Sequence, residues 1–256
     1  MQYKRIIVCL DIRDGRTTKG IKFRDNADVG DPVEMAGEYN RQGADEIVLY
    51  DISASVEGRS INRDLIEKVA KIVTVPLCVG GGLASLDDIR SVMLAGAKKV
   101  SLNSAAVKNP GIIEEAAKLF GKKAVLLGMD ALADKAMPSG YRVVIKGGRE
   151  PMDMDAVAWA RKAESLGAGE IVMNSIDADG VQDGYDVTLT RKIAEAVKIP
   201  VIASGGAGKP EHLVEVLSAG KADAALVASM VHYGKYTVGG LKRFLAQRGI
   251  SVREAA

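Results

Sequence analysis

The chain has 256 residues, of which 47% are hydrophobic and 27% charged, so it has enough apolar sequence for one large core. Its formal net charge of +2 gives no reason to expect nucleic acid or an anionic membrane as a partner. Cys9 and Cys78 lie singly in apolar runs, which favours buried reduced thiols over a disulfide or a metal site. No stretch resembles a signal peptide or the ~20 apolar residues of a membrane span, which predicts a soluble, cytoplasmic protein.

Short apolar runs alternate with amphipathic segments along the whole chain. Strands are expected near residues 5–11, 46–51, 75–80, 99–103, 123–129, 170–174, 199–203 and 223–228. Helical patterns lie between them, and several begin at Asp or Ser and end at Gly. Eight strand–helix pairs favour an α/β fold of the (β/α)8 TIM-barrel type over an open doubly wound sheet. Since no linker interrupts the pattern, residues 1–256 are expected to form one domain.

The second half of the chain repeats the first. "GADEIV" from Gly43 and "GAGEIV" from Gly167 lie 124 residues apart, and "VPLCVGGG" from Val75 and "IPVIASGG" from Ile199 have the same spacing. The spacing grows by one residue at the last strand, where Lys221 is an apparent insertion. A repeat at fixed spacing indicates a duplicated unit, which predicts two half-barrels, at about 1–120 and 121–256.

Two aspartates occupy equivalent positions in these halves. Asp11 closes the first predicted strand and Asp130 closes the fifth. In such barrels the active site lies at the carboxyl ends of the strands, so the two carboxyl groups are expected to face one cavity. Such a pair suits general acid and general base catalysis. The alternative is that each Asp only caps the following helix or binds a loop amide.

Glycine-rich segments with Ser or Asn nearby also occur twice. Gly82 with Asn103 and Ser104 follows strands three and four, and Gly206 with Ser229 follows strands seven and eight. Glycines let backbone N–H groups approach an anion, so two phosphate sites and an elongated substrate with a phosphate at each end are expected. Plain tight turns are the alternative. Lys19 lies in a long first loop that is expected to act as a lid and to reach a phosphate, unless its side chain is only solvated.

Together these motifs resemble a known family. The segments that match are "KRIIVCLDIRDG", "KGIKF", "VGDPVE", "YDISASVEGR", "CVGGG", "VSLNSAAV", "GAGEIVMNSIDADGVQDGYD" and "VIASGGAGKPEHL". In this order they are similar to the cyclase subunits of imidazole glycerol phosphate synthase, from about residue 3 to the C-terminal region. The resemblance implies a (β/α)8 barrel in histidine biosynthesis. Such an enzyme converts a bis-phosphorylated ribulosyl aminoimidazole carboxamide ribonucleotide and ammonia to imidazole glycerol phosphate and aminoimidazole carboxamide ribotide.

The resemblance also implies roles for single residues. Asp11 and Asp130 match the acid/base pair and Lys19 the lid lysine. The phosphate sites match Gly82, Asn103 and Ser104 at one end and Gly180, Gly206 and Ser229 at the other. Asp51, Asn174, Ser175 and Ser204 match positions that line the pocket. No metal or redox cofactor is expected, and His232, which has no Cys or His partner in the sequence, is not expected to bind one.

The resemblance further implies that ammonia comes from a glutaminase subunit docked on the amino-terminal face of the barrel. Arg5, Glu46, Lys99 and Glu170 match the charged ring that gates its entry. The alternative for these four residues is a salt-bridge network that only holds the barrel closed. Position 98 is Lys, where the family usually has Asp on the rim that faces the partner. A positive side chain therefore replaces a negative one at this position.

Three other functions remain open at this point. The sister isomerase of the same pathway is also a half-repeat barrel with two aspartates, but it consumes no ammonia. A paralogous amidotransferase partner in surface-polysaccharide synthesis is disfavoured by Asp11. A non-catalytic phosphate-binding scaffold would keep the glycines and need not keep both aspartates.

Overall fold

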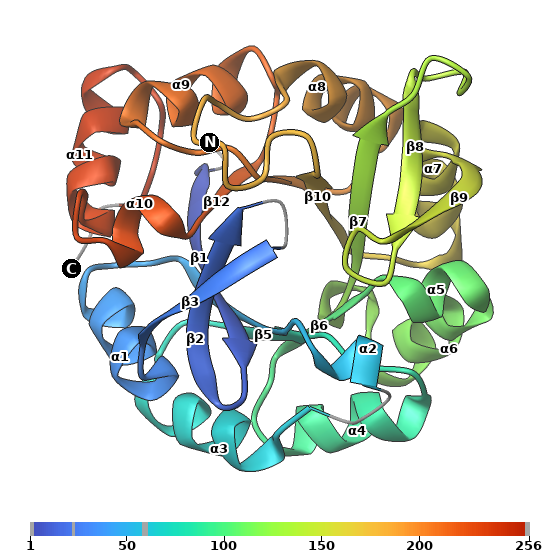
Figure 1. The fold of residues 1–256 in the computed structure, drawn as a ribbon, viewed down its shortest axis with the longest axis horizontal. Coiled ribbons are helices and arrows are strands. Elements are labelled where there is room, and N and C mark those ends of the chain that lie inside the picture. Colours follow the sequence, from blue (N-terminus) through green and yellow to red (C-terminus); the bar gives the residue numbers. More distant parts are fainter. Residues whose placement is uncertain (1–2, 22–23, 58–60, 254–256) are drawn as a thin grey trace.

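Eight parallel strands form a closed barrel in the computed structural model, which describes residues 3–21, 24–57 and 61–253. In order around the barrel they are β1 (Arg5–Arg13), β4 (Glu46–Asp51), β5 (Leu77–Gly80), β6 (Lys99–Leu102), β7 (Val125–Ala133), β10 (Glu170–Ser175), β11 (Val201–Ser204) and β12 (Ala224–Val227), and β12 pairs with β1 again. Figure 1 looks into this ring of strands, with the helices outside it. The predicted (β/α)8 fold and its strand positions are confirmed.

The helices of this outer layer are α1 (Pro32–Arg41), α3 (Arg63–Ile72), α4 (Leu86–Leu94), α6 (Gly111–Phe120), α7 (Ala156–Leu166), α8 (Val187–Ala196), α9 (Pro210–Ser218) and α11 (Val238–Gln247). Shorter helical segments are α2 (Ala54–Glu57), α5 (Ser104–Lys108), α10 (Ser229–His232) and a 3-10 turn (Lys122–Ala124). Polar side chains start several of the helices: Asp31 accepts hydrogen bonds from Val33 N and Glu34 N, and Ser85 forms a capping box with Asp88. No helix among the described residues is both long and apolar enough to cross a membrane.

Side-chain alternation along the strands separates two cores. In β1, Ile6, Val8 and Leu10 pack in the large cluster between barrel and helices, whereas Ile7 and Cys9 belong to a smaller cluster inside the barrel. Because alternate residues of a strand share one face, Arg5 and Asp11 lie on the inner face with Ile7 and Cys9. The barrel interior is therefore apolar in the middle and charged at both ends.

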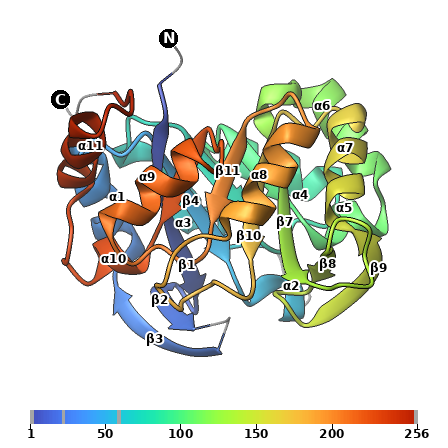
Figure 2. The ribbon, with the colours of Figure 1, turned by 90° about the horizontal axis from the view of Figure 1, so that it is seen from above.

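Two antiparallel hairpins extend the barrel sheet. The first contradicts the expectation of a long loop after the first strand, and the second lies where no strand was expected. β2 (Arg16–Ile21) and β3 (Arg24–Gly30) continue from β1, and β8 (Tyr141–Ile145) and β9 (Glu150–Asp155) continue from β7. Both parent strands therefore run past their aspartates, to Arg13 and Ala133, because the hairpins supply further ladder partners. Figure 2 shows both hairpins on the face where β1 and β7 end, with the N-terminus on the opposite side.

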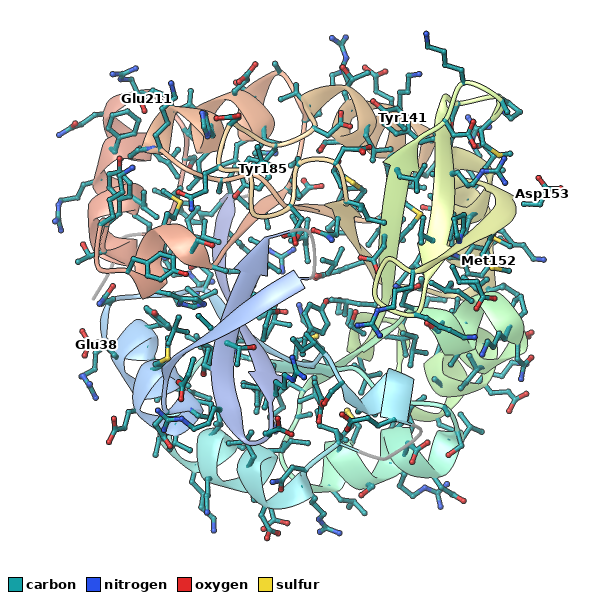
Figure 3. All side chains as sticks on the ribbon, viewed as in Figure 1. Glu38, Tyr141, Met152, Asp153, Tyr185 and Glu211 are labelled. Carbon is teal, nitrogen blue, oxygen red and sulfur yellow. The ribbon has the colours of Figure 1, made fainter. Side chains whose placement is uncertain are left out.

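The outer surface carries most of the charged side chains. In Figure 3, Glu38, Glu211 and Asp153 lie at the edge of the molecule, whereas Tyr185 lies further in. Tyr185 is buried and its hydroxyl donates to the Leu226 carbonyl at 2.8 Å. This bond ties the segment between β10 and α8 to β12, so that the segment is held over the carboxyl ends of the strands.

Candidate active site

A cavity of about 690 Å³ opens at the carboxyl ends of the barrel strands. It brings together side chains and loops from both halves of the chain. The predicted site residues that line it are Asp11, Asp51, Gly82, Asn103, Ser104, Asp130, Asn174, Gly180, Ser204, Gly206 and Ser229. Both aspartates thus face one shared space, as the equivalence of the two halves suggested. The volume is suitable for a small organic substrate.

Asp11 reaches the cavity from β1. It lies beside Tyr50 in the ladder with β4 and beside Thr18 in the ladder with β2. Cys9 is two residues before Asp11, so its side chain lies on the same face of β1. The Cys9 thiol donates to Asp11 Oδ1 at 3.2 Å. Tyr50 also lines the cavity, and its hydroxyl donates to Ser101 Oγ at 3.0 Å, which connects β4 to β6 over the intervening β5. Burial raises the pKa of the Tyr50 hydroxyl well above its usual range, so that it remains a neutral donor.

Asp130 reaches the cavity from β7 and has a different set of neighbours. Asn103 Nδ2 donates to Oδ2 at 2.8 Å, and Asn174 Nδ2 donates to Oδ1 at 3.2 Å. Burial raises the pKa of Asp130 to about 6, the charges of Asp179 and Asp11 add to this rise, and the two amide hydrogen bonds oppose it. The carboxyl group therefore exchanges its proton close to neutral pH, which is the range that general acid–base catalysis needs.

The glycine segments after β5 and β11 have matching backbone conformations. Gly81 and its equivalent Gly205 have φ values of 87° and 86°, and Gly206 has a φ of 105°, all in a region that only glycine adopts readily. A Cβ on Gly81 would collide with the Asp51 carbonyl oxygen, and one on Gly206 with the Gly184 carbonyl oxygen. Both segments pass so close to neighbouring backbone that a side chain is excluded, and they expose main-chain groups to the cavity. This arrangement is typical of anion-binding loops, although a tight turn has the same requirement.

Two cations that the sequence analysis did not single out stand at the Ser104 end of the cavity. The β8–β9 turn lies against α5, since Lys146 N donates to Ser104 Oγ at 3.0 Å. Lys108 of α5 and Arg149 of the turn both line the cavity, and within the described residues neither forms an ion pair. Lys108 follows Ser104 by four residues, which places both on one side of the helix. Arg149 follows a "KGG" turn, a signal that in retrospect marks a second substrate-side loop.

Of the residues predicted to line the pocket, Ser175 is not brought to the cavity. Ser175 is 1% exposed and is absent from the lining, because its neighbour Asn174 points inward and the next residue of a strand points to the opposite face. Lys19 lies in β2 opposite Ala27, but its side chain lies outside the described residues. Asp51 lines the cavity and also accepts hydrogen bonds from Ser53 N and Ala54 N at the start of α2.

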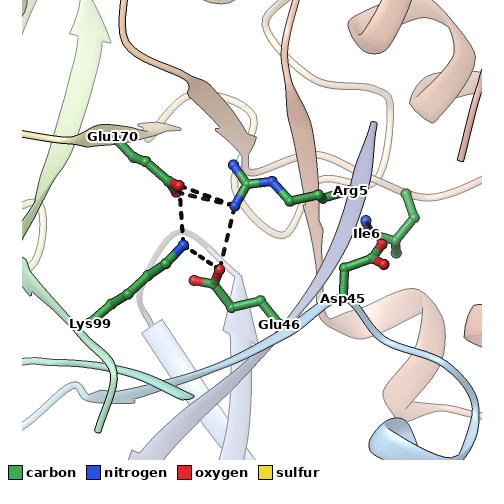
Figure 4. Close-up of polar contacts among 6 residues, drawn as sticks. All are labelled: Arg5, Ile6, Asp45, Glu46, Lys99 and Glu170. Atoms are coloured by element: carbon green, nitrogen blue, oxygen red, sulfur yellow. Dashed lines mark hydrogen bonds and ion pairs between the residues drawn. The ribbon is translucent and has the colours of Figure 1, made fainter. Parts of the chain in front are cut away.

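The four predicted gate residues meet at the other end of the barrel (Figure 4). Lys99 Nζ lies 2.6 Å from Glu46 Oε2 and 3.1 Å from Glu170 Oε1, and Arg5 Nη1 lies 3.2 Å from Glu170 Oε1 and 3.5 Å from Glu46 Oε2. Burial raises the pKa of Glu46. Burial also lowers the pKa of Lys99, but attraction to Glu46 and Glu170 outweighs it and leaves that pKa raised. The ring closes the barrel floor below the apolar interior.

His232 has structural partners. Its Nε2 donates to the Cys9 carbonyl at 2.9 Å, and its Nδ1 lies 2.7 Å from the Tyr39 hydroxyl. Among the described residues, no three His, Cys, Asp or Glu side chains gather as they would around a metal ion. Cys9 and Cys78 are both buried thiols, as expected.

Comparison with known proteins agrees with this architecture. Residues 5–237 match the family model described as histidine biosynthesis protein. The chain is 59% identical to imidazole glycerol phosphate synthase subunit HisF of Desulfosudis oleivorans and 58% identical to that of Syntrophobacter fumaroxidans. Each of these alignments covers 99% of both chains. The chain belongs to the HisF family.

The HisF family is the one that the sequence motifs resemble, so that prediction is confirmed. A third relative, subunit HisF of Solidesulfovibrio magneticus, is 56% identical, again over 99% of both chains. All three relatives carry the name imidazole glycerol phosphate synthase subunit HisF, and the sister isomerase is not favoured. The word "subunit" in their names also says that these relatives belong to a larger assembly.

Proposed function

We propose that this chain is the ammonia-dependent cyclase of histidine biosynthesis and that the reaction takes place in the 690 Å³ cavity. Its substrates are then the bis-phosphorylated ribulosyl aminoimidazole carboxamide ribonucleotide and ammonia. Its products are imidazole glycerol phosphate and aminoimidazole carboxamide ribotide. The observation that carries the proposal is that Asp11 and Asp130 line one cavity between two equivalent glycine loops.

The two aspartates supply complementary proton transfers. One donates a proton as ammonia replaces a carbonyl oxygen of the substrate, and the other takes a proton as the imidazole ring closes and the ribotide leaves. Their surroundings differ, since Asp130 has two amide donors and Asp11 has a thiol donor. Groups with the same chemistry but different surroundings can divide the acid and base roles between them.

The ends of the cavity bind the two phosphates. One phosphate lies at the end formed by Gly82, Asn103 and Ser104, where Lys108 and Arg149 add positive charge. The other lies at the end formed by Gly180, Gly206 and Ser229. The lining cations of the described residues are Arg13, Lys108 and Arg149, so charge is unevenly distributed around the cavity.

Ammonia enters through the ring of Arg5, Glu46, Lys99 and Glu170, supplied by a glutaminase subunit on the amino-terminal face. Lys98 is exposed next to this ring and lines a shallow apolar hollow with Val73 and Pro76. A partner that docks here needs a carboxylate rather than a cation opposite Lys98. The gating role predicts that Lys99→Met changes glutamine-dependent turnover of the complex and leaves turnover with an ammonium salt intact. An equal change in both assays would contradict gating.

The deciding experiment incubates the purified chain with the bis-phosphate substrate and an ammonium salt and measures both products. Asp11→Asn and Asp130→Asn should each lower turnover at least a thousandfold, about what loss of a general acid or base costs, without loss of the fold. Asp64→Asn, in an exposed first turn of α3, is the matched control and should be fully active. Full turnover in either site variant would remove the pair from the mechanism. Isomerisation of the bis-phosphate without ammonia uptake and without either cyclase product would indicate the isomerase, and substrate binding without turnover would indicate a scaffold.

A further inference from the structure

The carboxyl group of Asp130 is held on both oxygens by amides from its two neighbouring barrel strands. Asn174 lies directly beside Asp130 in the β7–β10 ladder, so the two side chains point to the same face. Asn103 comes one residue after β6, on the opposite flank of β7. Each asparagine gives one N–H to a different carboxylate oxygen, at 2.8 Å from Asn103 and 3.2 Å from Asn174.

Glycines make room for both asparagines. A Cβ on Gly205 would lie 2.8 Å from Asn174 Oδ1, so the Asn174 amide fits between this bare backbone and Asp130. On the other flank, a Cβ on Gly128 would lie 2.6 Å from Ser101 Oγ and 3.8 Å from the Asn103 Cβ. The missing side chain lets β6 approach β7 closely at this level. The oxygen of the Asn103 amide is buried without a hydrogen-bond partner among the described residues, so the orientation of this side chain depends on its bond to Asp130.

We infer that Asn103 and Asn174 are positioning residues that clamp the Asp130 carboxyl group in one orientation toward the substrate. This differs from the role expected from the sequence, where Asn103 was assigned to a phosphate and Asn174 to the pocket wall. The inference rests on the proposed function, because it takes Asp130 to be a reacting group. Hydrogen bonds to a charged carboxylate are strong enough to fix its rotamer, and an orientation error of about 1 Å costs on the order of a hundredfold in rate.

The two amide hydrogen bonds also oppose the effect of the other neighbours on the pKa of Asp130. The titratable and charged side chains that line the same cavity are Cys9, Asp11, Arg13, Tyr50, Asp51, Glu57, Asp88, Lys108, Arg149 and Asp179. Of these, Asp179 and Asp11 raise the pKa of Asp130, as burial does, while the two amides lower it. Removing one amide should therefore move this pKa upward, by about one pH unit for a charge-assisted hydrogen bond.

The test uses the full chain with 13C-labelled aspartate, so that NMR follows the titration of Asp130 independently of turnover. Asn174→Leu and Asn103→Leu remove one donor each at similar volume. Asn174→Asp, which has the size and polarity of Asn, is the second variant in case the apolar side chain prevents folding. Asn109→Leu is the matched control for the titration alone, because Asn109 lines the same cavity with no bond to Asp130.

We expect Asp130 to titrate about one pH unit higher in the donor-less variants, and higher still in Asn174→Asp, where a like charge replaces a donor. The limb of the kcat–pH profile that reports Asp130 should move by the same amount. At neutral pH kcat should fall about tenfold while KM changes less than about twofold.

Three results would overturn the inference. The first is an unchanged Asp130 titration in all the variants, the second an unchanged kcat profile despite a shifted titration, and the third a raised KM at constant kcat, which would make the asparagines substrate contacts. The first and third results leave the proposed function intact, whereas the second would also count against Asp130 as a proton-transferring group. Failure of the proposed function shows separately, as full ammonia-dependent turnover in Asp130→Asn.

Discussion

Lys242 Nζ lies 2.8 Å from Asp45 Oδ1, and the two side chains are only 3% and 5% exposed. The second oxygen of Asp45 accepts from Ile6 N at 2.8 Å, a contact that appears at the right of Figure 4. This buried pair joins α11, the last helix, to the entrances of β1 and β4. It therefore ties the end of the chain to the strand that carries Asp11.

Lys242→Met should destabilise the protein by about 3–5 kcal/mol, because it leaves the Asp45 charge buried without its partner. Chemical denaturation measures the loss. The matched control is Lys118→Met, which breaks an exposed ion pair with Glu114 and should leave stability almost unchanged, because solvent screens such a pair. The double variant Lys242→Met/Asp45→Asn should recover part of the loss, and no recovery would mean that packing of the lysine stem matters more than charge.

Lys99→Met should destabilise the barrel floor by about 2 kcal/mol, because Glu46, whose side chain is 1% exposed, keeps only the longer contact with Arg5. A carboxyl pKa that is raised in the folded state contributes stability at low pH and loses it as pH rises through that pKa. The pKa of Glu46 is already raised and should rise further without Lys99. The destabilisation should therefore grow between pH 5 and pH 8, as denaturation at the two pH values would show. A loss that is equal at both would exclude this account.

Asp130→Asn should abolish turnover and yet stabilise the fold above neutral pH. The pKa of Asp130 is about 6 in the folded protein against an ordinary value of 3.8, so stability is present at low pH and is lost as pH rises through 6. The gain on removing the charge is on the order of 2 kcal/mol at pH 8, after allowance for solvent access, or a rise of a few degrees in Tm. At pH 4 the gain should disappear. A gain that does not depend on pH would point to packing instead.

Arg149→Gln should raise KM for the bis-phosphate substrate about tenfold with little change in kcat, because a charge-assisted contact to phosphate is lost in ground and transition states alike. Lys108→Gln should act in the same direction. Steady-state kinetics at low and moderate salt would also show a weaker salt dependence of KM in both variants. Arg161→Gln, on the exposed side of α7, is the control. An unchanged KM in both site variants would place the phosphate elsewhere.

The barrel strands were predictable from sequence because strands buried on both faces are nearly continuous apolar runs. The hairpins were not, because "RTTKGI", "RDNADVG" and "EPMDMD" have no such run. These segments become strands only through hairpin pairing: β2 pairs with β1 and β3, and β9 pairs with β8, which pairs with β7. The division of the chain near residue 120 stays a prediction.

Much of the cavity lining was also predictable, since equivalent strand ends must meet around one opening. The outward orientation of Ser175 was not predictable. Adjacent residues of a strand face opposite ways, and the sequence does not say which of Asn174 and Ser175 faces the barrel interior. Arg149 and Lys108 come from a turn and a short helix whose approach to Ser104 depends on tertiary packing. The amide partners of Asp130 depend in the same way on how closely β6 and β10 approach β7.

The hairpins leave β3 and β9 as outer strands, whose main-chain groups are open to pairing with another molecule. Such edges invite aggregation unless something interrupts them. On β9, Pro151 offers no N–H, and Asp153, with a 97% exposed side chain, would bring charge against any added strand. On β3, Asp28 is paired with Arg16, so an incoming chain would have to desolvate an ion pair. These residues oppose the addition of another strand to β3 or β9. The two hairpins can therefore extend the sheet beside the cavity without promoting aggregation through their edges.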